Sequence, residues 1–113
     1  MIDFQVYQEQ SSNTAIYPED IRLDSGLIYV ALGLTNEAGE IAGVIKKMIR
    51  DSGGEMTPEI KQKLAAEAGD LLWYLARLCT EVELRMEDVA QANLVKLADR
   101  QGRGVLQGSG DDR

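Results

Sequence analysis

The sequence contains no histidine and only one cysteine, Cys79. Without histidine, Ser-His and Cys-His nucleophile pairs, histidine metal ligands and the Glu-x-x-His sites of di-iron helical bundles are excluded. A lone cysteine forms no internal disulfide and no zinc-type cysteine cluster. Because Cys79 lies in the apolar run of residues 71–82, we expect it to be a small core residue.

The sequence also has no long apolar run and no basic segment. Residues 1–5 do not resemble a signal peptide, and the longest apolar stretch, residues 27–34, is far shorter than the roughly 20 residues that cross a bilayer. The formal net charge is −7, which argues against nucleic acid or an anionic membrane as a partner. We therefore expect residues 1–113 to form a single cytoplasmic domain with its own core.

Two near-copies of one acidic pattern are present, Glu37-Ala38-Gly39-Glu40 and Glu67-Ala68-Gly69-Asp70. Residues at i and i+3 share a helix face, with Cβ atoms roughly 5–6 Å apart, so each copy gives one pair of carboxylates. The two pairs lie at nearly equal distances from a helix break at residues 51–58. An antiparallel helix hairpin would bring all four carboxylates together.

Converging carboxylates repel one another, and partial burial strengthens the repulsion. A hard divalent cation with oxygen ligands would relieve this repulsion. Mg²⁺ is typical: it keeps several waters, and substrate phosphates complete its coordination. Spacing alone leaves a second interpretation open, in which the acids are solvated side chains on amphipathic helices. The matched pairs beside apolar Ile41 and Leu71 support the hypothesis of a metal site.

Apolar periodicity and capping signals predict an all-α fold. The expected helices span about residues 3–10, 26–50, 58–82 and 86–101. Asp24 or Ser25 is the expected N-cap of the second helix, and Thr57, followed by Pro58, that of the third. The third helix is apolar nearly all round from Leu71 onward, which predicts burial against a partner subunit as well as the core.

Three glycines lie inside the second helix, where each costs about 1 kcal/mol relative to alanine. For Gly33, Gly39 and Gly43 we favour close approach by a neighbouring helix or ligand over simple tolerance. Trp73 is expected in the core or an interface, with base stacking as the alternative. A base could also contact a tyrosine, and spacing does not select among Tyr7, Tyr17 and Tyr29.

The fourth helix carries two distinct faces. An apolar stripe is expected to join the core and consists of Val89, Ala90, Leu94 and Leu97. A second face carries Asn93, Lys96 and Arg100, with Arg103 beyond them, and is either a solvated basic face or a phosphate-binding one. The tail, residues 104–113, is either a flexible end or a loop that closes a site, because Gly108-Ser109-Gly110 offers backbone N–H groups and Arg113 pairs with phosphate.

Glu37-x-x-Glu40, the spacer of residues 41–66 and Glu67-x-x-Asp70 resemble the signature of the MazG-type all-α nucleoside triphosphate pyrophosphohydrolases. Asn93-x-x-Lys96-Leu97-x-x-Arg100 resembles the family's basic motif, and residues 103–113 are similar to the tail of a MazG-like subgroup. The resemblance implies an antiparallel four-helix MazG-like bundle. It also implies oligomerisation through helix faces, as a homodimer or homotetramer.

The resemblance further implies hydrolysis of a (deoxy)nucleoside triphosphate between its α- and β-phosphates, in nucleotide-pool housekeeping. The implied metal is Mg²⁺, with Mn²⁺ as a substitute, and its implied ligands and catalytic carboxylates are Glu37, Glu40, Glu67 and Asp70. Lys96 and Arg100 would stabilise the leaving pyrophosphate, and Lys47 is a weaker candidate. The full set of implied substrate-binding residues is Asn93, Lys96, Arg100, Arg103, Ser109 and Arg113.

Two alternatives to this function stay open. One is a pyrophosphohydrolase that acts on another phosphorylated metabolite, of the phosphoribosyl type. The other is a non-catalytic helical interaction module whose acids are merely exposed; it predicts no effect of Mg²⁺ on thermal stability.

Overall fold

The computed structural model describes residues 1–19 and 26–113, and over these residues all regular secondary structure is helical, without strands. The elements are α1 (Phe4–Ser11), a 3₁₀ turn (Ser12–Thr14), α2 (Leu27–Ser52), α3 (Pro58–Glu81) and α4 (Met86–Gly102). The predicted all-α class is confirmed, and the helix ends agree closely. The expected caps Asp24 and Ser25 lie outside the described residues. Within those residues, no helix combines the length and apolarity needed to cross a membrane.

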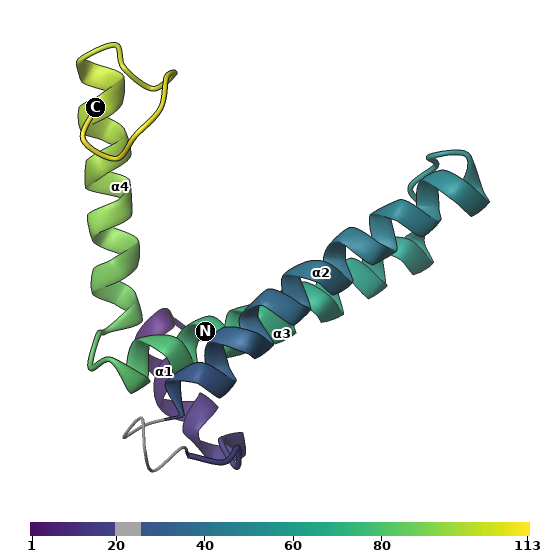
Figure 1. The fold of residues 1–113 in the computed structure, drawn as a ribbon, viewed down its shortest axis with the longest axis horizontal. Coiled ribbons are helices and arrows are strands. Elements are labelled where there is room, and N and C mark those ends of the chain that lie inside the picture. The colour runs from purple at the N-terminus through teal and green to yellow at the C-terminus, as the bar shows by residue number, and fades with distance from the viewer. Residues whose placement is uncertain (20–25) are drawn as a thin grey trace.

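Local side-chain chemistry sets the helix ends around the hairpin turn. Gly53 ends α2 in the left-handed conformation, with φ of 61°, which glycine adopts without a steric penalty. The hydroxyl of Thr57 accepts a hydrogen bond from the Ile60 N–H at 3.2 Å, with Pro58 at the first helical position of α3. The predicted cap is therefore confirmed, and the turn sends α3 back along α2 (Figure 1).

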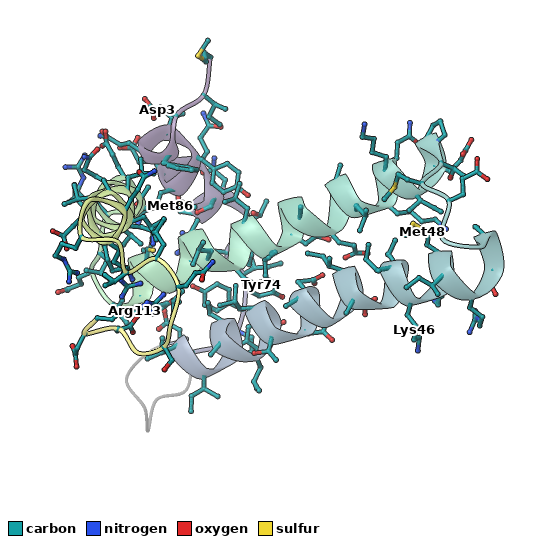
Figure 2. The ribbon with its side chains drawn as sticks, turned by 90° about the horizontal axis from the view of Figure 1, so that it is seen from above. Asp3, Lys46, Met48, Tyr74, Met86 and Arg113 are labelled. Atoms are coloured by element: carbon teal, nitrogen blue, oxygen red, sulfur yellow. The ribbon has the colours of Figure 1, made fainter. Side chains whose placement is uncertain are left out.

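One aromatic ring of α3 packs against α2 toward the end of the hairpin opposite its turn. Tyr74 points from α3 between the two helices (Figure 2), and its ring crosses α2 at Gly33, where an added Cβ would lie 2.1 Å from Cε1 of Tyr74. This confirms the close approach expected at Gly33. At Gly39 and Gly43 no described atom lies within 4 Å of such a Cβ, so within one chain packing explains only the first glycine.

The core lies where α1 crosses α3. Its buried members are Ala76, Cys79 and Met86, with Tyr7, Leu72 and Leu75 packed against them. Cys79 is 3% exposed, as predicted for a core residue, and burial raises the pKa of its thiol. The side chain of Gln8 donates to the Leu84 carbonyl at 2.8 Å and accepts from the Met86 N–H at 2.8 Å. These bonds fix the turn before α4 to α1.

Helix α4 leaves this junction and projects away from the hairpin (Figure 1), packing mainly on α1. The turn before it contains Glu83 in a left-handed conformation, with φ of 59°. Most of the apolar stripe expected in the core is exposed instead, Val89 by 40%, Leu94 by 64% and Leu97 by 41%, whereas Ala90 is half-buried. That prediction is wrong for one chain because α4 is directed away from α2. The described helices of one chain therefore do not close into a four-helix bundle.

Candidate metal and nucleotide site

Three of the four predicted acids converge on the facing sides of α2 and α3. One carboxylate oxygen from each of Glu37, Glu67 and Asp70 lies within 4.8 Å of the other two. We call these three residues the acid cluster. Glu40 does not join the group, but it lines an adjoining cavity together with Glu67. The antiparallel hairpin thus produces the expected convergence for three carboxylates and leaves the fourth beside them.

The acid cluster is electrostatically strained. The pKa of Glu37 is raised, first by partial burial, then by a hydrogen bond with Glu67 and by the negative charges of Asp70, Glu67 and Glu40. The pKa of Tyr74 is also raised, again mainly by burial, then by the adjacent Tyr29, with the negative charges of Glu37 and Asp70 adding to the effect. Both shifts show that further negative charge is unfavourable at this place, and a bound cation would reverse that preference.

The donor set suits a hard divalent cation. Carboxylate oxygens are the ligands that Mg²⁺ prefers, at roughly 2.1 Å, so two oxygens on one ion are at most about 4.2 Å apart. The observed spread of up to 4.8 Å needs only a small rotation of flexible side chains to close. Asp70 is exposed and the other two members are partly buried, which leaves one side open for water and phosphate oxygens.

Two hollows adjoin the acid cluster, on opposite sides along the hairpin. The first, of about 270 Å³, is lined by Glu37, Asp70, Trp73 and Tyr74. The second, of about 360 Å³, lies toward the hairpin turn. Its charged lining residues are Glu40, Lys47, Asp51, Lys63 and Glu67.

Sequence reasoning missed Lys63, although it precedes Glu67 by one helical turn and so shares its face. Lys47, a weaker candidate from the sequence, lines the same hollow. Of the aromatic candidates, only Trp73 lines the hollow beside the acids. The adjacent Tyr74 also lines this hollow, and its sequence position does not single it out.

The basic residues expected at the site lie elsewhere in the same chain. Lys96 Nζ is 3.9 Å from the Asp111 carboxylate. Arg100 is buried, 5% exposed, and donates to the Asp111 carbonyl at 2.8 Å. Arg103 pairs with Asp99 at 2.8 Å. These cations face the tail on the projecting α4, so within the described residues of one chain they do not join the acid cluster (Figure 1).

The tail folds back on the end of α4 instead of extending into solvent. Arg113 is its anchor (Figure 2), and its guanidinium donates to the carbonyls of Val105 at 3.0 Å, Leu106 at 3.1 Å and Gly110 at 2.6 Å. Arg103 donates to the Arg113 carbonyl at 2.8 Å. Asn93 and Ser109 are exposed. The guanidinium of Arg113 is therefore engaged with the tail itself.

Comparison with known proteins adds to this geometry. Residues 28–104 match a family model described as the MazG nucleotide pyrophosphohydrolase domain. The chain is also similar to the "Gene 37 protein" of Mycobacterium phage L5, at 49% identity over 110 residues that cover 96% of each chain. No solved structure matched. The matched range contains both acidic patterns and the basic face of α4, and the chain belongs to the MazG nucleotide pyrophosphohydrolase family.

Proposed function

We propose that this protein hydrolyses (deoxy)nucleoside triphosphates between the α- and β-phosphates, giving a monophosphate and pyrophosphate, with Mg²⁺ held by Glu37, Glu67 and Asp70. The observation that supports this best is the convergence of the three carboxylates in a chain of a pyrophosphohydrolase family. When bound, Mg²⁺ would offset phosphate charge and lower the pKa of the attacking water.

The residues of the chain would divide the remaining work. Glu40 stands outside the acid cluster but on the same wall as Glu67, so its carboxylate would be free to accept the proton of the attacking water. The open side of the cluster would admit the triphosphate. The aromatic and aliphatic side chains around it would limit access of bulk water and so strengthen the electrostatic interactions.

The basic residues of α4 and the tail would act through an oligomer. In one chain Lys96 and Arg100 face the tail, and the exposed stripe of Val89, Leu94 and Leu97 lies on the same projecting helix. A second copy that covered this stripe could bring the first copy's basic face to its own acids. We therefore propose a homodimer or homotetramer in which Lys96, Arg100 and Asn93, with Arg103, Ser109 and Arg113, contact the substrate phosphates.

The test is pyrophosphate release from a panel of canonical and damaged (deoxy)nucleoside triphosphates, with Mg²⁺, with Mn²⁺ and with EDTA. Release that requires the metal and is matched by equimolar monophosphate is the expected result, and the panel would also reveal the base preference. If folded protein that binds Mg²⁺ released no pyrophosphate from any of these compounds, another phosphorylated metabolite would be the better candidate for the substrate. If Mg²⁺ also failed to bind, a helical interaction module would be the better explanation. Light scattering would measure the number of 12.4 kDa subunits.

A further inference from the structure

The two sides of the acid cluster differ in chemistry. Beside its carboxylates, the first hollow is lined by the rings of Trp73 and Tyr74, whereas the hollow toward the hairpin turn has Lys47 and Lys63 beside its carboxylates. Resting on the proposed function, we propose that the hairpin binds the nucleotide in one direction. The base lies against Trp73 and Tyr74, and the leaving pyrophosphate lies on Lys47 and Lys63 of the same chain.

Contacts within the chain hold the rings of the aromatic side in place. The Tyr74 ring is seated over Gly33, and the Trp73 ring meets it edge to face, with centroids 5.1 Å apart and planes at 89°. Trp73 Nε1 donates to the Thr14 hydroxyl at 2.9 Å, and the ring of Tyr17 lies 6.1 Å away. Rings held in this way present a preorganised surface to a base and lose little conformational entropy when it stacks.

The other side offers two available positive charges. Among the described residues, neither Lys47 nor Lys63 forms a salt bridge. Lys47 does interact with exposed Asp51, whose pKa is lowered mainly by its hydrogen bond with Arg50 and more weakly by the charge of Lys47. Both side chains are exposed and line the hollow together with the carboxylates of Glu40, Asp51 and Glu67. Ammonium groups bind phosphate as point charges. Pyrophosphate, which carries several negative charges in a compact group, is the part of a nucleotide that this hollow suits best.

The order of these residues along α3 matches the order of the groups in a nucleotide. Lys63, Glu67, Asp70 and Tyr74 recur at the spacing of one helix face. Lys63 lies one turn before Glu67, and Tyr74 lies one turn after Asp70, each step being roughly 6 Å along the axis. Along α3, the lysine, the acids and the aromatic ring therefore follow the same order as the pyrophosphate, the α-phosphate and the base of a nucleotide.

The reverse orientation is unfavourable on chemical grounds. It would seat the charged pyrophosphate against the apolar rings, where desolvation is not repaid by a counter-charge. It would also leave the base among the two lysines and Glu40, without a ring on which to stack. The larger hollow, of about 360 Å³, lies within the roughly 300–1,000 Å³ of small-molecule sites, and the smaller one, of about 270 Å³, is just below that range.

The test measures binding of the two products separately, in Mg²⁺, by calorimetry. Inorganic pyrophosphate and a deoxynucleoside monophosphate are titrated into the wild type, a Lys47→Gln/Lys63→Gln double variant and Trp73→Leu. We expect the lysine variant to weaken pyrophosphate binding at least tenfold and monophosphate binding less than twofold. Trp73→Leu should give the opposite pattern, because base stacking on an aromatic ring contributes about tenfold or more to affinity. Lys61→Gln, an exposed lysine of the same helix, is the matched control and should change neither.

Two further readouts keep the proposal open to refutation if Trp73→Leu fails to fold. Trp73 is the sole tryptophan, so wild-type fluorescence should change with the monophosphate and not with pyrophosphate. Trp73→Phe should weaken only the monophosphate. Unchanged pyrophosphate affinity in the lysine variant, or equal losses for both products in both variants, would overturn the orientation. Because these assays need no turnover, a crossed pattern without catalysis would reject the proposed reaction alone, and turnover without the pattern would reject the orientation alone.

Discussion

Replacing Glu37 with glutamine should stabilise the metal-free protein. The substitution keeps the shape of the side chain and removes one of three clustered negative charges. The repulsion between Glu37 and each of Glu67 and Asp70 disappears with that charge. Most substitutions destabilise a protein, so a gain in stability would be a specific sign of like-charge strain.

The size of the gain follows from the geometry. The carboxylate oxygens lie no more than 4.8 Å apart, and two unit charges at that separation repel by about 1 kcal/mol in a water-like dielectric and by about 3.5 kcal/mol at an effective dielectric constant of 20. Asp70 is exposed and its two neighbours are only partly buried, so the lower value applies. With two pairs relieved and salt screening included, the free energy of unfolding should rise by about 1–2 kcal/mol. For a domain of this size that corresponds to a Tm higher by about 4–8 °C.

The assay is thermal and urea unfolding in EDTA, at low and at high NaCl. Glu55→Gln, which removes an exposed acid between α2 and α3, is the control and should change stability by no more than about 0.5 kcal/mol. The gain from Glu37→Gln should shrink in high salt, and Mg²⁺ should reverse the order by stabilising the wild type more. A Glu37→Gln protein no more stable than wild type in EDTA at low salt would refute the reasoning.

Three further predictions concern the glycines, pH and the tail. Gly33→Ala should lower the free energy of unfolding by about 1–3 kcal/mol, because the new Cβ meets the Tyr74 ring. Gly39→Ala should raise the free energy of unfolding by about 0.5–1 kcal/mol. Equal effects of the two substitutions in urea unfolding would contradict this packing. Because the folded-state pKa of Glu37 is raised above 4.5, the stability lost to its ionisation in EDTA should be absent below that pH and grow as pH rises through the raised value. The difference in Tm between Glu37→Gln and wild type should therefore open over that range, and a pH-independent difference would argue against it. Deleting residues 108–113 should raise KM several-fold if the tail contacts phosphate; an unchanged kcat and KM would limit the tail to its structural role.

The helices and their hairpin were predictable because their signals are local. Thr57 and Pro58 mark the start of α3 through capping chemistry, and Gly53 ends α2 by adopting a positive φ. The level acidic pairs then predicted an antiparallel hairpin, and three of the four carboxylates do converge. Glu40 falls just outside because a spacing of i+3 gives a shared face but not the direction in which each side chain extends.

The direction of α4 was not predictable from its own sequence. Its apolar stripe shows which face avoids water, but not what covers that face. The path depends on the left-handed turn at Glu83 and on the hydrogen bonds that Gln8 makes across the chain. For the same reason Lys96 and Arg100, correctly grouped on one face, lie against the tail in the single chain.

The residues that surround the acids were only partly predictable from the sequence. Four aromatic candidates for base contact could not be separated by spacing, because the choice depends on which ring reaches the acids across the hairpin. Tyr74 does so only because Gly33 leaves room for its ring. Lys63 could have been found from its position one turn before Glu67, on the same face.

The most direct test of the proposed reaction compares product formation by the wild type and by Asp70→Asn in Mg²⁺. We expect the wild type to release pyrophosphate and monophosphate in equal amounts. The variant should remain folded and be at least about 100-fold slower, because one metal-holding carboxylate is lost. Near-normal turnover by folded Asp70→Asn, or release of single phosphate in place of pyrophosphate, would contradict the assignment of the acid cluster.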